Sequence, residues 1–490
     1  MSRSTSSGSI VEMPAWELSK EIHSREVSCR EVMDAYLNHI DRVNPKVNAI
    51  VALQDRGGLM RQAEEKDKAL ARGRSDGWMH GFPQAIKDLE DTEGIVSSYG
   101  SPILKNYVPQ KDSNMVARMK AAGSIVIGKT NTPEWGYGSQ TYNEVYGPTG
   151  NPYDPEKTSG GSSGGTACAV SLRMQAVADG SDYMGSLRNP AGWCNIYGYR
   201  PSWGRIPSPG LDLYLNSCAM RGPMARTVAD LALLLSTQSG YDVNVPASLE
   251  DDPDLKSLTP CNVHDRLKAD MKGKKVAWLG NWDGYLPMEK GVLELCEKAL
   301  ATFPSFGVTV ESIKPPYDPQ KFWDEIWLPF RHFSAVLLKV HYEDPEKRKL
   351  LKPEAVFEYE NSADYSARDL YQASVKRSDW YRALLEVYEK YDYVAVPTAQ
   401  VFPFEKTLHW PKEVDGRKMD TYHRWMEVVT HWTMSGNPVV AVPAGFNDAG
   451  LSMGIQIVGK QRGDFDLLQF AYAYETANDW VNARRPKILD

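Results

Sequence analysis

The sequence feature that most constrains this chain is a block of glycine and serine at residues 160–165, which reads Gly-Gly-Ser-Ser-Gly-Gly. Four glycines around two serines allow the backbone to adopt positive φ and other conformations that side chains disfavour. Small hydroxyls in such a loop can approach another chain segment closely. The block leads into small residues that we expect to form a helix over about 166–175, with its positive end facing the loop.

A second serine, Ser186, lies 24 residues after Ser162 and follows an apparent strand at 176–178. Both hydroxyls are therefore expected at strand ends, where they could meet. A phosphate-binding loop would end in Gly-Lys-Ser or Gly-Lys-Thr, whereas here Thr166 follows the last glycine directly. The glycine run therefore does not indicate a nucleotide site.

Either serine needs a base to become a nucleophile. None of the nine histidines lies in this part of the sequence, and Ser186 lacks the Gly-x-Ser-x-Gly turn of the α/β-hydrolases. The other candidate for the base is Lys87, because it ends an apolar run at 83–86 that looks like a buried strand. Burial lowers the pKa of a lysine, so a neutral amine could act as the base. A Ser-His-Asp triad assembled from distant residues and an ordinary solvated lysine remain the alternatives.

The composition excludes several classes of function. Of the 490 residues, 42% are apolar and 24% are charged, which is typical of a globular protein. The net charge is −7, and no basic cluster is long enough to follow a phosphate backbone, so no nucleic acid partner is expected. The six cysteines are scattered, which argues against a disulfide framework or a zinc site.

The first residues are polar, and no segment approaches the roughly 18 apolar residues of a membrane span. We therefore expect a cytoplasmic protein with no membrane partner. We also expect a mobile tail over residues 1–14.

Short apolar runs alternate with amphipathic segments, which favours an α/β fold with helices on the faces of a sheet. Residues 14–43 have helical periodicity, and Ser28 with Glu31 forms a capping-box pattern within them. We expect strands at 83–86, 124–128, 275–279, 308–313, 394–397 and 439–443, and further helices at 113–122, 227–237 and 291–303. The order strand, helix, strand over 275–313 predicts a β-α-β unit, and the polar stretch 242–259 predicts a linker or surface excursion.

Six of the fourteen tryptophans lie between Trp323 and Trp432. One interpretation is a helical layer that packs with large side chains. The other is a helical cap over an apolar or aromatic substrate pocket.

Three separated blocks combine into one pattern. Residues 81–88 read Gly-x-Pro-x-x-x-Lys-Asp, residues 160–165 are the glycine and serine block, and residues 182–190 read Asp-x-x-Gly-Ser-Leu-Arg-x-Pro. In order and spacing they resemble the amidase signature enzymes, which are serine hydrolases with a Ser-Ser-Lys triad. The resemblance extends over about residues 15–480 and includes the segments 128–134, 222–226, 397–398, 436–438 and 443–445.

The resemblance implies a fold and a triad. The fold would be a large twisted mixed β-sheet with helices on both faces, in one catalytic domain over 15–485, with 320–432 as a helical, Trp-rich substrate cap. Lys87 would be the general base, Ser162 the bridging serine in a cis peptide, and Ser186 the nucleophile. Ser163 competes for the bridging role, but the 24-residue spacing to the nucleophile decides against it.

The resemblance also implies supporting groups around the nucleophile. Asp182 and Arg188 would orient the loop, and the backbone N–H groups of Tyr183, Met184, Gly185 and Ser186 would form the oxyanion hole. Met184 stands where the family usually has glycine. If that position needs positive φ, methionine would strain the turn by about 1–2 kcal/mol. Otherwise Met184 projects an apolar side chain toward the pocket or the core.

The function that follows is hydrolysis of a small to medium apolar or aromatic amide through an acyl-enzyme on serine, with no metal or organic cofactor. A carbamate (urethane) or ester hydrolase with the same triad is the first alternative. Others are an amidotransferase A subunit, which acts with partner subunits and ATP, and a non-catalytic binding protein on the same fold. The resemblance leaves monomer and homodimer open, and we favour a homodimer.

Overall fold

The computed structural model of the chain describes residues 7–215 and 217–490. Its centre is an eight-stranded sheet with the order β4-β6-β5-β12-β13-β9-β7-β8. The strands are β4 (Val177–Asp182), β5 (Tyr197–Arg200), β6 (Met220–Ala225), β7 (Lys275–Trp278), β8 (Thr309–Ser312), β9 (Tyr393–Pro397), β12 (Val439–Phe446) and β13 (Ser452–Val458). Neighbours are antiparallel from β4 to β9, whereas β9, β7 and β8 are parallel. The predicted mixed α/β fold is therefore confirmed.

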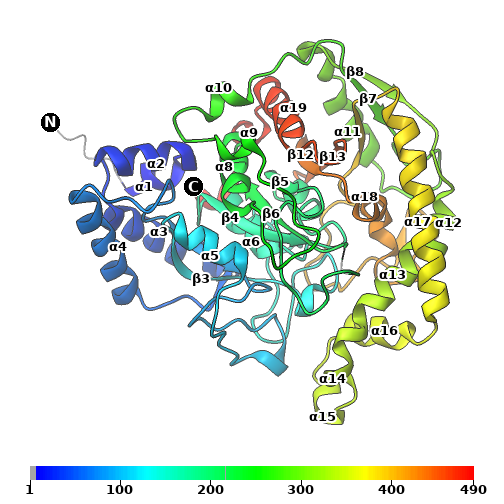
Figure 1. The fold of residues 1–490 in the computed structure, drawn as a ribbon, viewed down its shortest axis with the longest axis horizontal. Coiled ribbons are helices and arrows are strands. Elements are labelled where there is room, and N and C mark those ends of the chain that lie inside the picture. Colours follow the sequence, from blue (N-terminus) through cyan, green and yellow to red (C-terminus); the bar gives the residue numbers. More distant parts are fainter. Residues whose placement is uncertain (1–6, 216) are drawn as a thin grey trace.

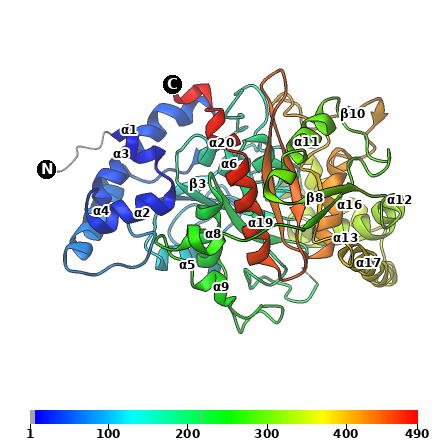
Figure 2. The same cartoon turned by 90° about the horizontal axis from the view of Figure 1, so that it is seen from above.

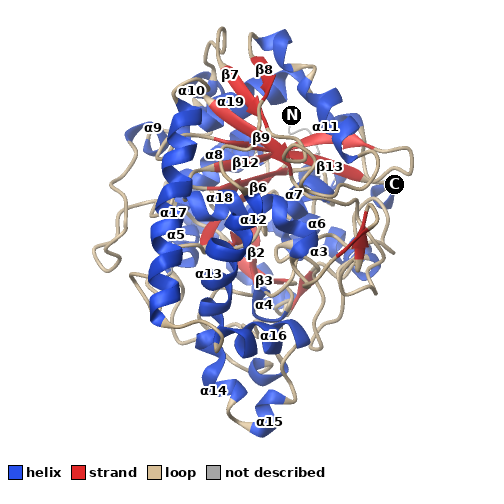
Figure 3. Cartoon of the chain, turned by 90° about the vertical axis from the view of Figure 1, so that its right-hand side faces the viewer, coloured by secondary structure: helices blue, strands red, loops and turns tan. Residues whose placement is uncertain are grey.

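Helices lie on either side of this sheet and beyond its ends (Figure 3). They are α1 (Ser7–Glu12), α2 (Ala15–Ser24), α3 (Cys29–Val43), α4 (Arg56–Ala71), α5 (Asn114–Ala121), α6 (Gly164–Ser171), α7 (Asn189–Trp193), α8 (Val228–Gln238), α9 (Pro253–Lys256), α10 (Val263–Leu267), α11 (Val292–Leu300), α12 (Pro319–Phe322), α13 (Leu328–Phe333), α14 (Lys339–Tyr342), α15 (Pro345–Arg348), α16 (Pro353–Ser362), α17 (Ala367–Tyr388), α18 (Thr430–Ser435), α19 (Asp464–Ala477) and α20 (Trp480–Ala483). The N-terminal helices α2 to α4 lie at one end of the molecule and α14 to α17 at the other (Figures 1 and 2).

Several local predictions are confirmed. The side chain of Ser28 accepts from the backbone N–H of Glu31, and Glu31 accepts in return from the Ser28 N–H, so the capping box starts α3. The β7-α11-β8 segment forms the predicted parallel unit. β12, predicted as a strand over 439–443, is a central strand whose side chains are buried over 439–445, which explains its continuous apolar run.

A second, three-stranded sheet holds Lys87, which differs from the prediction of one large sheet. It consists of β1 (Ile50–Val51), β2 (Pro83–Lys87) and β3 (Ile125–Thr130), in the order β1-β3-β2. Side chains near the edge strand β4 link the two sheets. Gln175 accepts from the Ala85 N–H at 2.9 Å, and Asp179 on β4 accepts from the Lys87 N–H at 3.1 Å. These contacts fix the end of β2 beside the large sheet.

The predicted mobile tail over 1–14 is wrong for its described part. Residues 1–6 lie outside the described residues, but α1 begins at Ser7, and Ile10 and Val11 are buried in the core. Arg226 donates to the carbonyls of Val11, Glu12 and Met13. A guanidinium therefore satisfies the carbonyls at the end of this short helix, which residue periodicity does not reveal.

The tryptophans of 320–432 belong mainly to the core. Trp323, Trp327, Trp380, Trp425 and Trp432 are buried. His431 stacks on Trp282 and lies edge-on to Trp380, and the rings of Trp282, Trp380 and Trp432 contact one another at tilted angles. The interpretation as a helical layer packed with large side chains therefore describes them better than the interpretation as pocket-lining groups.

Among the described residues, no helix combines the length and the apolar character that a membrane span requires. Within the same residues, no group of three or more His, Cys, Asp or Glu side chains could hold a metal ion.

Candidate active site

Lys87 is the last residue of β2 and is fully buried. Burial lowers the pKa of its amine to about 7, although Asp179, Asp182 and Glu90 oppose the shift. Among the described residues, no carboxylate lies within ion-pair distance of the Lys87 amine, whose neighbours are neutral oxygens. A substantial share of the amine is therefore neutral near pH 7.

Three serines surround the Lys87 amine. Its Nζ lies 2.8 Å from both Ser162 Oγ and Ser163 Oγ, 3.0 Å from Ser181 Oγ, and 3.2 Å from the Ser181 carbonyl oxygen. The Gly161–Ser162 peptide bond is cis, as the resemblance implies. The glycine and serine block thus approaches the lysine closely, as its composition predicts.

The two adjacent serines differ in how their hydroxyl protons are used. Ser163 donates to the Ser181 carbonyl at 3.2 Å and accepts from the Ser181 N–H at 3.4 Å. Its remaining lone pair can only accept from Lys87. Ser162 has no partner except Lys87 among the described residues, so its proton is available to the lysine lone pair. This arrangement favours Ser162 over Ser163 as the proton carrier.

Ser186 and Ser162 line the same cavity, and both are almost fully buried. Ser186 follows β4 in the turn that leads to α7, whereas Ser162 precedes α6. The two serines therefore come from different loops at strand and helix ends, as the sequence predicts.

The loop over 182–186 uses one glycine in the left-handed region. Gly185 has φ of 85°, whereas Met184 is not among the residues with positive φ. Met184 is buried and lines the cavity. The strain that methionine would cause at positive φ is therefore absent. The presence of Met184 in place of the usual glycine instead changes the wall of the cavity.

The four amides of the predicted oxyanion hole are not equivalent. The Gly185 N–H donates to Asp182 Oδ1 at 3.0 Å. Among the described residues, the N–H groups of Tyr183, Met184 and Ser186 have no hydrogen-bond acceptor. The prediction that Gly185 also serves the oxyanion is therefore weakened, because its proton already binds a carboxylate.

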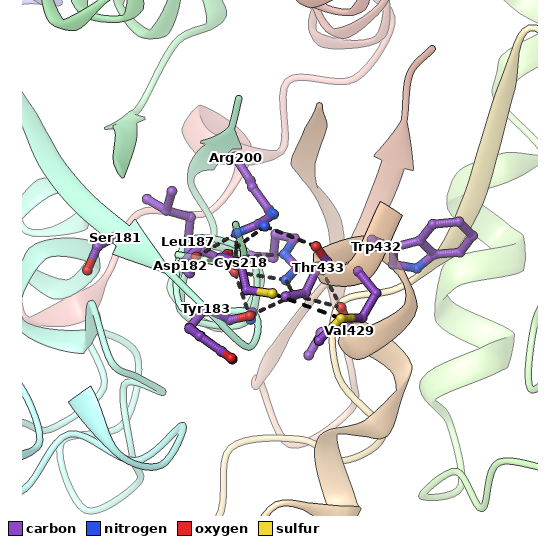
Figure 4. A network of polar contacts seen from close by, with 12 residues as sticks. Ser181, Asp182, Tyr183, Leu187, Arg200, Cys218, Val429, Trp432 and Thr433 are labelled. Carbon is purple, nitrogen blue, oxygen red and sulfur yellow. Dashed lines mark hydrogen bonds and ion pairs between the residues drawn. The ribbon is translucent and has the colours of Figure 1, made fainter. Parts of the chain in front are cut away.

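Asp182 is the centre of a buried network behind this loop (Figure 4). Arg188 donates to both carboxylate oxygens, at 2.9 and 2.8 Å, and Arg200 approaches Oδ1 at 3.2 Å. Burial alone would raise the pKa of Asp182, but the two guanidinium groups outweigh it and hold the pKa well below its usual range. A carboxylate held ionised in this way suits the predicted role of Asp182 and Arg188 in orienting the loop, without proton transfer.

The shared cavity has a volume of about 530 Å³. Its wall is mainly aromatic and aliphatic, and includes Trp135, Tyr137, Met184, Phe330, Phe333 and Met426. Phe330, Phe333 and Met426 come from the 320–432 segment, but none of the six tryptophans of that segment lines the cavity in the described part of the chain. A cavity of this size and character suits a drug-sized apolar ligand.

A family model described as Amidase matches residues 31–468. The chain belongs to the amidase family. An acylamidase from Rhodococcus erythropolis is 31% identical over 476 residues, which cover 96% of this chain and 97% of that protein. The A subunit of glutamyl-tRNA(Gln) amidotransferase from Acaryochloris marina (strain MBIC 11017) is also 31% identical, over 503 residues that cover 96% of this chain and 99% of that protein. The crystal structure of a bacterial aryl acylamidase of the amidase signature family superposes with a TM-score of 0.88 at 27% identity, covering 97% of this chain and 98% of that chain.

Sequence reasoning missed four residues of this amidase site. Ser181 contacts the lysine amine, Asp179 contacts the lysine backbone, and Arg200 and Thr433 contact the loop over 182–186. Ser181 and Asp179 lie two residues apart on β4, so their side chains are on the same face of the strand. This alternation could have identified both residues from the sequence. Arg200 and Thr433 come from β5 and α18, and nothing in the local sequence connects either with the loop.

Gly185→Ala is expected to lower kcat for an amide substrate about tenfold or more, because alanine is strained at positive φ and a displaced loop misplaces its N–H donors. A Cβ at this position would also lie 2.9 Å from a Val429 methyl group. Gly94→Ala is a matched control, since Gly94 has φ of 75° but nothing within 4 Å of the added Cβ. Equal kcat values for the two variants would contradict the assigned loop geometry.

Proposed function

We propose that this amidase hydrolyses carboxylic amides through a covalent acyl-enzyme on Ser186. The neutral Lys87 amine takes the hydroxyl proton of Ser162, while Ser162 takes the proton of Ser186. The Ser186 oxygen then bonds to the amide carbonyl carbon, and the π electrons of the carbonyl move onto its oxygen. The free N–H groups of the 183–186 loop stabilise the negative charge that develops there.

Collapse of the tetrahedral intermediate breaks the C–N bond. The Lys87 ammonium returns its proton through Ser162 to the leaving nitrogen, which departs as a neutral amine. Water then attacks the Ser186 ester and loses its proton along the same relay. The carboxylic acid leaves, Ser186 regains its proton and Lys87 is neutral again, so one water is consumed per amide and neither a metal nor an organic cofactor is needed.

The strongest support for this proposal is the position of Lys87 beside Ser162. Lys87 Nζ lies 2.8 Å from Ser162 Oγ in a fully buried site, while Ser162 and Ser186 share one cavity. A lysine with ordinary exposure would be charged and could not accept a proton at pH 7.

The apolar cavity supports a small to medium amide with an apolar or aromatic acyl or amine group. Phe330 and Phe333 of α13 and Met426 line it, which supports the 320–432 segment as part of the substrate enclosure. Because the oxyanion contacts involve the carbonyl and not the leaving group, esters and carbamates are the alternative substrates. The test is turnover by the purified chain of matched anilide, ester and carbamate substrates with the same acyl group. Turnover of the ester or carbamate without turnover of the anilide would favour the ester or carbamate function.

The similarity to the A subunit of a tRNA-dependent amidotransferase supports one further candidate, the same role in this chain. Such a protein would need partner subunits and ATP to complete its reaction. We expect the purified chain alone, without ATP, to hydrolyse the anilide. Activity that appears only after partner proteins co-purify would support the amidotransferase instead.

The pH dependence follows from the neutral base. Below a pKa of about 7 the Lys87 amine is protonated and cannot accept a proton, so kcat/KM should fall about tenfold per pH unit on the acid side. Above that pKa the amine is neutral, so kcat/KM should reach a plateau. A flat kcat/KM profile down to about pH 5 would contradict lysine as the base.

The substitution Asp179→Asn tests the pH dependence of kcat/KM. Burial raises the pKa of Asp179 to about 7, and its negative charge, once formed, raises the pKa of Lys87. Asp179→Asn removes that charge, so the acid limb of kcat/KM should move to lower pH. Asp254→Asn, at an exposed position on α9, is the control and should leave the limb in place. An acid limb that stays fixed or moves to higher pH in Asp179→Asn would contradict the assignment of the acid limb to Lys87.

A further inference from the structure

The loop over 182–186 carries the proposed nucleophile, Ser186. Each of its three free N–H groups belongs to a peptide unit whose carbonyl accepts a hydrogen bond. In a planar trans peptide the C=O and N–H bonds point in opposite directions, so fixing the carbonyl fixes the direction of the N–H. The N–H of Tyr183 shares its peptide unit with the Asp182 carbonyl, and the N–H of Met184 shares its unit with the Tyr183 carbonyl. What binds these two carbonyls therefore determines where the two N–H groups point.

Two side chains bind these carbonyls. Arg200 Nη1 donates to the Asp182 carbonyl oxygen at 2.5 Å, and Thr433 Oγ1 donates to the Tyr183 carbonyl oxygen at 2.7 Å. Both side chains are fully buried and lie around the loop in Figure 4. The third free amide, that of Ser186, differs, because the N–H groups of Arg188 and Asn189 bind the Gly185 carbonyl locally at 2.8 and 2.7 Å.

The Thr433 hydroxyl has only one proton to donate. The Tyr183 carbonyl is its closer acceptor at 2.7 Å, since the Val429 carbonyl lies at 3.4 Å. The hydroxyl also accepts from Arg188 Nη2 at 3.0 Å, and Arg188 is bound to the Asp182 carboxylate. A charged donor thus polarises the hydroxyl and strengthens its bond to the carbonyl.

We propose that Thr433 and Arg200 are positioning residues of the oxyanion hole: Thr433 aims the Met184 N–H and Arg200 aims the Tyr183 N–H. Neither side chain is among the described residues that line the cavity. Both act through the rigid peptide unit, and both come from elements far from the loop in sequence. The inference rests on the proposed function, because it assumes that a tetrahedral oxyanion forms on Ser186.

This role predicts an effect on the transition state and not on ground-state binding. A free amide that can rotate donates poorly to an oxyanion, while the apolar walls that bind the rest of the substrate remain unchanged. Thr433→Val keeps the shape of the side chain but cannot donate. Thr433→Ser keeps the hydroxyl.

The test measures kcat and KM on an anilide, together with the inhibition constant of a trifluoromethyl ketone that carries the same acyl group and forms a tetrahedral adduct. For Thr433→Val we expect kcat to fall about 10- to 100-fold, KM to stay within about twofold, and the ketone to bind more weakly by a similar factor as kcat falls. Thr433→Ser should recover kcat to within about threefold of the wild type. Thr430→Val is the matched control, because Thr430 lies on the same helix and its buried hydroxyl binds only the Glu427 carbonyl among the described residues.

Three results would overturn the inference: unchanged kcat and ketone affinity in Thr433→Val, a rise in KM with kcat unchanged, or Thr433→Ser as impaired as Thr433→Val. If Thr433→Val does not fold, Thr433→Cys replaces it, with a weaker donor of similar size and an expected kcat clearly below that of Thr433→Ser. Ser186→Ala in the same assay separates the two proposals. If it retains turnover, the acyl-enzyme itself is wrong, whereas an inactive Ser186→Ala with a fully active Thr433→Val overturns only the positioning role.

Discussion

Ser186→Ala is expected to lower kcat for an amide substrate by about 10⁴-fold or more, because it removes the atom proposed to form the covalent bond. Lys87→Ala should cause a loss of similar order, since the members of a catalytic triad act as one unit and their effects are not additive. Lys87 also forms hydrogen bonds with two buried serines and the half-buried Ser181, so both variants need a check that they remain folded. The measurement is single-turnover hydrolysis of an anilide alongside a thermal unfolding curve.

The two neighbouring serines provide an internal control for this prediction. Ser162→Ala should be far more damaging than Ser163→Ala, because the Ser163 proton is already bound to the Ser181 carbonyl. Near wild-type turnover in Ser186→Ala or Lys87→Ala would make the triad assignment wrong. A larger loss in Ser163→Ala than in Ser162→Ala would reverse the bridging role.

Arg188→Met is expected to destabilise the protein by about 3–5 kcal/mol, because removal of one partner of a buried ion pair leaves the other charge uncompensated. Asp182 would keep only one guanidinium partner, Arg200 at 3.2 Å, beside the N–H groups of Gly185 and Leu187. The carbonyl of Val429 and the side chain of Gln456 would also lose their donor, now at 2.8 and 2.7 Å. The measurement is the free energy of unfolding in urea.

Arg56→Met is the matched control for this effect. Arg56 contacts the carboxylates of Asp34 and Asp41, but its side chain is 41% exposed. An exposed pair of this kind contributes about 1 kcal/mol or less. Equal losses of unfolding free energy in the two variants would contradict the assignment of Asp182 and Arg188 as the buried support of the loop.

Local sequence patterns predicted the parts of the site that depend on composition and spacing. The apolar run before Lys87 indicated its burial, and the glycine and serine block indicated close approach. The spacing between Ser162 and Ser186 selected the bridging serine. Each of these signals lies within a few residues of the feature that it predicts, or follows from the resemblance to one family.

Other features depend on contacts between distant segments and could not be predicted in this way. The carbonyls at the end of α1 are satisfied by Arg226, more than 200 residues away, so residues 7–12 read as a tail. Thr433 reaches the Tyr183 carbonyl over a separation of 250 residues. Five of the six tryptophans of 320–432 lie in the core. Composition could not predict this, because aromatic residues pack equally well in a core layer and in a pocket wall.

Covalent trapping shows directly whether Ser186 carries the acyl group and whether Lys87 activates it. The protein would be mixed with an activated ester of a slow-deacylating acyl group, quenched in acid within one turnover, digested, and examined by mass spectrometry at several pH values. We expect one acyl group on the peptide that contains Ser186, formed at a rate that rises with pH through about 7 and that nearly vanishes in Lys87→Ala. An acyl group on another residue, or acylation of Ser186 that is independent of pH and of Lys87, would contradict this expectation.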